Sequence, residues 1–88
     1  MNDEQREQYQ NLINRMSDAQ IDREQERLMA IQRTVMRQAR SLAYRLRDAR
    51  TRNDPAARRR VHDAAGVLLV TYRDATEKLE MVNERYDF

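Results

Sequence analysis

The chain has 88 residues with no cysteine, no tryptophan, one glycine, one proline and one histidine. Without cysteine there is no disulfide framework, thiolate nucleophile or cysteine-based zinc site. One glycine and one proline leave almost no material for the turns between strands. The longest apolar run, residues 64–70, is far shorter than the roughly 20 residues of a membrane span. The first residues do not read as a signal peptide. We therefore expect a single helical domain over 1–88 that is cytoplasmic and does not enter a membrane.

The residues that usually carry catalysis are also missing or scattered. The one histidine, His62, has no second ligand at a metal-binding spacing. The many carboxylates sit in polar stretches, and no glycine-rich loop is present to hold a phosphate. We therefore expect no catalytic site, no metal and no cofactor.

Apolar residues repeat at helical spacing on both sides of the only obvious break, Asn53-Asp54-Pro55. Aspartate is a favoured N-cap, and proline is favoured at the first helical position. The pattern predicts an antiparallel helical hairpin. Its two stripes are Ile21, Leu28, Val35, Ala39, Leu42, Leu46 and Ala49 before the break, and Val61, Ala65, Leu68, Tyr72, Ala75, Leu79, Val82 and Tyr86 after it.

A shorter stripe, Tyr9, Leu12, Ile13 and Met16, lies about 110° around the helix axis from the first long stripe. A continuous helix drifts only about 20° per heptad, so the jump predicts a break. Ser17 and Gln20 have the spacing of a capping box. We expect an all-α fold with helices at about 3–16, 18–52 and 55–86, forming a three-helix or dimeric bundle. The alternative is one unbroken helix over 3–52.

If the turn is centred between residues 53 and 54, facing residues have numbers that add up to about 107. Leu28 then faces Leu79, and Gln32 comes close to Tyr72, whose hydroxyl is a candidate partner for the buried amide. The first helix is long enough to cover only the base of the hairpin, where we expect it to bury Met29 and Met81.

The third helix has more apolar residues than one partner helix can cover. Three lie near its middle, beyond the reach of the first helix, and we expect them to mediate self-association as a homodimer: Val67, Leu69 and Val70. Gly66 beside them indicates either a close helix–helix approach or a tolerated cost of about 1 kcal/mol. We expect four methionines to fill the core rather than form a binding face: Met16, Met29, Met36 and Met81.

Charge is strongly segregated along the chain. Residues 33–60 contain ten arginines against two acids and carry +8, whereas residues 1–32 and 61–88 carry −3 each. A hairpin gathers the positive charge at its turn. The candidate binding residues are Arg37, Arg40, Arg45, Arg47, Arg50, Arg52, Arg58, Arg59 and Arg60.

Three interpretations of this arginine cluster stay open. It could dock onto an acidic protein surface, or neutralise nucleic-acid phosphates. It could also be a solvated face on which Asp48 pairs with Arg45 and Arg52, and Asp63 with Arg59. We expect a non-enzymatic protein-binding module, such as an adaptor, regulator or inhibitor that occludes a partner. A nucleic-acid-binding regulator and a structural assembly component are the alternatives.

Overall fold

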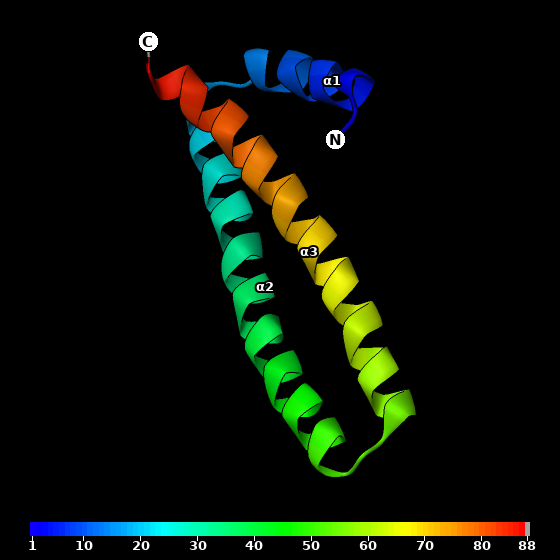
Figure 1. The fold of residues 1–88 in the computed structure, drawn as a ribbon. Coiled ribbons are helices and arrows are strands. Elements are labelled where there is room, and N and C mark those ends of the chain that lie inside the picture. Colours follow the sequence, from blue (N-terminus) through cyan, green and yellow to red (C-terminus); the bar gives the residue numbers. More distant parts are fainter. Residues whose placement is uncertain (88) are drawn as a thin grey trace.

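The computed structural model describes residues 1–87 and consists of three α-helices with a short closing turn (Figure 1). Helix α1 spans Asp3–Asn14, α2 spans Asp18–Thr51, α3 spans Pro55–Glu84, and a 3₁₀ turn follows at Arg85–Asp87. Helices α2 and α3 run antiparallel as a long hairpin, and α1 lies across its base. The predicted all-α hairpin with a separate N-terminal helix is confirmed, and the alternative of one unbroken first helix is wrong.

Capping bonds explain why the chain breaks between α1 and α2. The Gln20 amide donates to Ser17 Oγ at 3.2 Å, and the Ser17 amide donates to Gln20 Oε1 at 2.8 Å. These two bonds satisfy donors that a new helix otherwise leaves unpaired, as expected from the capping-box spacing. Asn2 and Gln5 form a second capping box at the start of α1, which the sequence reading did not single out.

The turn at the other end of the hairpin, which we call the tip, closes with a Schellman motif. Asn53 has a φ of 53°, a left-handed conformation that asparagine tolerates better than most residues. The Asn53 amide donates to the Arg50 carbonyl at 3.1 Å, and the Asp54 amide donates to the Ala49 carbonyl at 2.9 Å. The Asp54 side chain then accepts from the Ala57 amide at 3.1 Å. One aspartate thus ends α2 and begins α3 as its N-cap.

Buried residues repeat every seven positions along the seam between α2 and α3. Two hydrogen bonds cross this seam: Gln25 Nε2 donates to Asn83 Oδ1 at 2.9 Å, and Gln32 Nε2 donates to Thr76 Oγ1 at 3.1 Å. Both pairs confirm the predicted register to within one residue. The expected partner of Gln32 was wrong, because Thr76 rather than Tyr72 accepts its bond. The buried seam residues are Ile21, Leu28, Val35, Leu42, Ala49, Val61, Ala75 and Val82.

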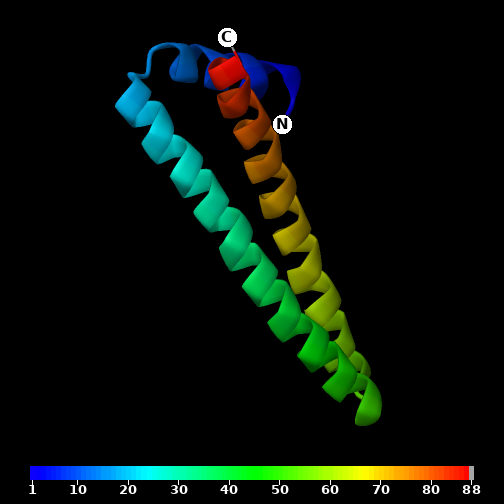
Figure 2. The ribbon, with the colours of Figure 1, turned by 90° about the vertical axis from the view of Figure 1, so that its left-hand side faces the viewer.

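The main core lies at the base, where α1 closes one side of the hairpin. Its residues are Tyr9, Ile13, Ile21, Leu28, Ala75, Met81 and Val82. Met81 is buried as expected, whereas Met29 keeps 39% of its surface exposed. Figure 2 shows the reason, because the end of α3 is drawn in front of α1 and the viewer faces the side that α1 leaves uncovered. Met29 lies five residues after Glu24, which contacts α1, and therefore about 140° around α2 from it.

A polar network fastens α1 to the hairpin. Tyr9 Oη donates to Glu24 Oε1 at 2.9 Å, and Arg27 Nε donates to Glu24 Oε2 at 3.0 Å. Lys78 Nζ lies 5.4 Å from the centre of the Tyr9 ring, within cation–π range. Bonding to Arg27 lowers the pKa of Glu24 despite its partial burial. Burial, and then the bond to Glu24, raise the pKa of the Tyr9 phenol.

The C-terminal end of α3 adds a second fastening. Arg85 Nη1 donates to the Ile13 carbonyl at 2.7 Å, near the end of α1 where carbonyl groups lack helical partners. Arg85 also lies 3.5 Å from a carboxylate oxygen of Asp18 at the start of α2. One arginine therefore connects all three helices at the base.

Candidate protein-binding surface

The hairpin has two sides, which we call the covered side, where α1 packs, and the free side opposite it. On the covered side, α1 meets Glu24 and Arg27 of α2 and Lys78 of α3. An α-helix turns about 100° per residue, so two residues that are 7 or 18 positions apart in the same helix lie on the same side of it. This spacing allows each candidate residue to be assigned to one side.

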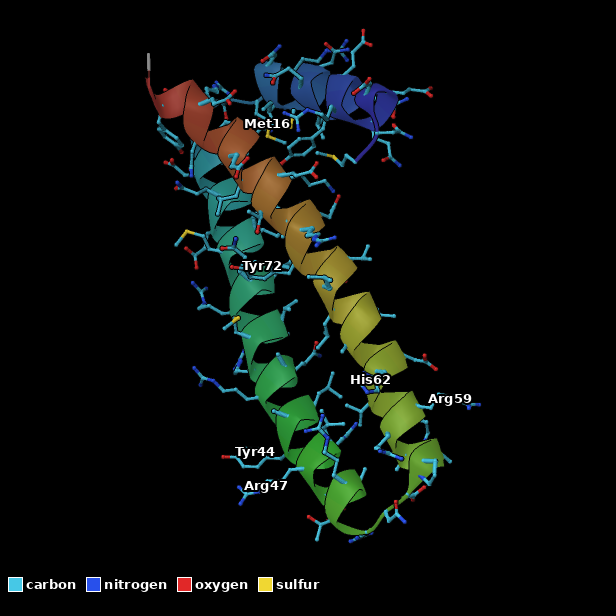
Figure 3. The ribbon with its side chains drawn as sticks, in the orientation of Figure 1. Met16, Tyr44, Arg47, Arg59, His62 and Tyr72 are labelled. Carbon is cyan, nitrogen blue, oxygen red and sulfur yellow. The ribbon has the colours of Figure 1, made fainter. Side chains whose placement is uncertain are left out.

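The nine candidate arginines occupy both sides of the tip. Arg45 lies five turns after Arg27 and so falls on the covered side, where Arg52 and Arg60 join it around one cleft. Arg37 and Arg40 instead line a groove with Met29 and Met36. Figure 3 shows Arg47 and Arg59 at the tip end of the hairpin, on α2 and α3 and extending in opposite directions. The cluster that the sequence suggested as one site is therefore divided.

Most of these arginines have no acidic partner in the described part of the chain. Arg52 Nε lies 3.3 Å from Asp48 Oδ2, and this is the one ion pair that involves any of the nine. The pairs expected between Arg45 and Asp48 and between Arg59 and Asp63 do not form. The expected pair between Asp48 and Arg52 therefore forms and the other two expected pairs do not, and a solvated face stays an open interpretation of the cluster.

A cleft of about 250 Å³ opens on the covered side of the tip, and we call it the tip cleft. Its charged rim consists of Arg45, Arg52 and Arg60 with Asp48 and Asp54. Its apolar floor consists of Leu42, Ala49, Ala57 and Val61. Guanidinium groups above an apolar floor suit a carboxylate carried by an apolar segment. The sequence analysis identified the arginines but not the cleft, although Leu42, Ala49 and Val61 of its floor belong to the predicted stripes.

The tip cleft continues into a second groove toward the base. This covered-side groove, of about 450 Å³, shares Leu42 and Arg45 with the tip cleft and adds Ala64, Val67 and Leu68 from α3. Val67 is 67% exposed, and it lies seven residues before Asp74, which lines a pocket with Tyr9 of α1. Between the end of α1 and the tip, α3 therefore carries an apolar strip that α1 does not cover.

The three residues expected to mediate self-association do not share one patch. Leu69 lies about 200° around α3 from Val67. It lines a different groove, of about 320 Å³, with Ala39, Ala43 and Ala65 on the free side. Val70 lies about 60° around α3 from Val67 and is therefore also on the covered side. All three side chains are exposed, as expected, but they belong to two surfaces.

Of the predictions about the methionines, Gly66 and His62, some are confirmed and others are wrong. Met16 and Met81 pack in or against the core, as predicted, but Met29 and Met36 are exposed, and their assignment to the core was wrong. A side chain built at Gly66 would meet nothing within 4 Å, so no close approach inside this chain requires glycine there. His62 is exposed and lines the free-side groove beside Leu69.

Among the described residues, no group of three histidines or carboxylates is placed to hold a metal ion. In the same part of the chain, none of the helices has the length and apolar character needed to cross a membrane. Comparison with protein families, with curated proteins and with solved structures found no match to this chain.

Proposed function

We propose that this chain is a non-enzymatic binding module whose tip docks onto an acidic surface of another protein. By covering that surface it acts as a small adaptor, regulator or inhibitor. The observation that carries this proposal is the tip cleft, where Arg45 and Arg60, which have no acidic partner among the described residues, lie beside an apolar floor. Unpaired guanidinium groups attract and orient an acidic partner during association.

The tip cleft and the covered-side groove indicate the chemistry of the bound segment. Together they place Arg45, Arg52 and Arg60 beside a continuous apolar strip that ends at Val67. A segment that carries both acidic and apolar side chains matches this surface better than acidic residues alone. Charged pairs at the rim then set orientation, and apolar side chains in the groove supply most of the affinity.

Nucleic acid is the competing partner, and the placement of the aromatic residues disfavours it. Tyr44 lies about 100° around α2 from Arg45, and Tyr72 lines the groove of Arg37 and Arg40 rather than the tip cleft. A platform of several aromatic side chains for stacked bases is therefore missing from the described residues around the tip.

The cytoplasmic location stays a prediction.

The test compares capture of proteins by three immobilised chains from a lysate of the source organism, used with and without nuclease treatment. The first is the wild type, and the second carries Arg45→Glu with Arg60→Glu in the tip cleft. The third is a control that carries Arg15→Glu with Arg23→Glu, two exposed arginines near the base that form no ion pair with the described residues. Both variants change the net charge equally, so only the position of the change differs.

We expect the wild type and the control to capture an acidic protein that the tip variant retains about ten- to a hundredfold less, as loss of two charge contacts implies. Equal capture by the tip variant would contradict the proposal. Capture that disappears after nuclease treatment, together with salt-dependent retention on a nucleic-acid column, would support the competing function instead.

A further inference from the structure

The free side of the hairpin carries two neighbouring grooves that no part of the described chain fills. The groove near the tip is apolar and is lined by Ala39, Ala43, Leu46, Ala65 and Leu69. The groove toward the base is lined by Met29, Met36 and Tyr72 together with Gln32, Arg33, Arg37 and Arg40. Met36 is 50% exposed and Leu69 49% exposed. An exposed apolar strip of this extent is typical of a surface that binds another helix.

Small residues in the floor of this groove allow a helix to come close. Ala39, Ala43 and Ala65 present only methyl groups, while Leu69 and Met36 project beside them. Helices pack at axial distances of about 8–10 Å, and small side chains at the contact permit the shorter end of that range. A pair of helices can therefore insert its own projecting side chains between those of this groove.

Charges on the free side are arranged in two opposite groups. Arg47 lies eleven residues, or about three turns, after Met36, and Arg58 lies eleven residues before Leu69. Both are near the tip. At the base, Asp22 lies two heptads before Met36 and Glu80 lies eleven residues after Leu69. Arg33, Arg37 and Arg40 line the groove between these two groups. The free side is thus basic from its middle to the tip and acidic at the base.

This distribution identifies the occupant of the groove. A wholly acidic partner would meet repulsion at the base, and a wholly basic partner would meet it at the tip. If a second copy of the chain runs in the opposite direction, the acidic base of each copy lies beside the basic tip of the other copy. A copy in the same direction would bring the two +8 segments together.

We propose that the free side binds a second copy of the chain in antiparallel orientation, forming a four-helix core that the single hairpin lacks. A two-fold axis perpendicular to the helices lays α2 over α2 and α3 over α3. Residues at the middle of each helix, such as Met36, then lie near the axis and face their own counterparts. The tip cleft lies on the covered side and stays accessible, so this proposal stands independently of the proposed function.

The test begins with the mass of the full chain in solution, measured by sedimentation equilibrium over a range of concentrations. We expect twice the chain mass for the wild type and for Val67→Glu, whose change lies on the covered side. Leu69→Glu and Met36→Glu, on the free side, should reduce the mass to that of one chain. Circular dichroism confirms that each variant stays helical, and two free-side variants guard against failure of one to fold.

Orientation is tested with single cysteines, which report cleanly because the chain has none of its own. Met36→Cys should form a disulfide-linked dimer under mild oxidation, whereas Arg47→Cys should stay monomeric on a denaturing gel. Linkage at both positions would overturn the antiparallel arrangement. A wild type that is monomeric at every concentration, or a mass reduced by Val67→Glu and not by Leu69→Glu, would overturn the free side as the dimer interface.

Discussion

The base and the tip of this hairpin are built from the same two helices but differ in what covers them. At the base, α1 packs over the seam, and Val82 of α3 has no exposed surface. Fifteen residues closer to the tip, no third helix is present among the described residues, and Val67 is 67% exposed. Two helices alone bury only a narrow seam. The fold is therefore completed at one end, and apolar surface is left exposed at the other.

The largest expected effect comes from the same substitution made in both regions. Val82→Ala removes two fully buried methyl groups and should lower the free energy of unfolding by about 2–3 kcal/mol. Val67→Ala removes exposed methyl groups and should change it by no more than about 0.5 kcal/mol. Urea denaturation of dilute samples measures both. Equal losses would contradict the assignment of the core to the base.

The polar network at the base should make its stability depend on pH. Arg27 holds the pKa of Glu24 below its usual 4.5, so the ionised carboxylate favours the folded chain. That contribution is present above pH 4.5 and is lost as the pH falls through the lower folded value. Glu24→Gln should therefore cost about 1–2 kcal/mol at neutral pH and progressively less below about pH 4.5.

Denaturant titrations at neutral pH and at about pH 3 measure this difference, since the contribution shrinks as the pH falls below the usual pKa of the carboxyl. Glu84→Gln is the control, because Glu84 is exposed near the same end and has no ion pair among the described residues. If Glu24→Gln lowered stability by the same amount at both pH values, the ion pair would not be the cause.

A smaller effect is expected at the tip, where Asp54 caps α3. Asp54→Ala leaves the Ala57 amide without its acceptor and should cost about 1 kcal/mol. Asp54→Asn keeps a good cap while it removes the charge, and it should cost a few tenths of a kcal/mol at most. Thermal denaturation separates the two. A similar loss in both variants would show that charge rather than capping matters at this position.

The smallest expected effect is a gain. Gly66→Ala places a methyl group in open space within a helix, so it should raise the free energy of unfolding by about 0.5–1 kcal/mol. The midpoint of urea denaturation at low protein concentration measures the change. A loss of stability would mean that another surface packs closely against Gly66 in solution.

The sequence predicts the elements and the register well, because both depend on local signals. The cap at Ser17, the turn at Asp54 and the repeat of apolar residues act within a few positions of each other. These signals place the helices to within one or two residues. They also place facing residues such as Gln32 and Thr76 to within one residue.

What the sequence does not predict is which side of the hairpin α1 covers. Both sides of the seam carry apolar residues, so the pattern does not show that α1 leaves Met29 exposed and covers the opposite side. The choice follows from three-dimensional contacts of Tyr9 with Glu24 and Lys78, residues far apart in the chain. For the same reason, the sequence does not show that the arginines are divided between the two sides of the hairpin. It could have shown that Val67 and Leu69 lie on different sides, because two residues correspond to about 200° around a helix.

The central claim is that the tip half of α3 is incomplete in a single chain, and amide hydrogen exchange of the dilute protein tests it most directly. Amides of residues 75–82, beside α1, should exchange only when the whole chain unfolds. Amides of residues 63–70 should exchange faster through local opening, because few buried contacts hold that part of α3. Equal protection along the whole helix, or slower exchange in residues 63–70, would contradict the account.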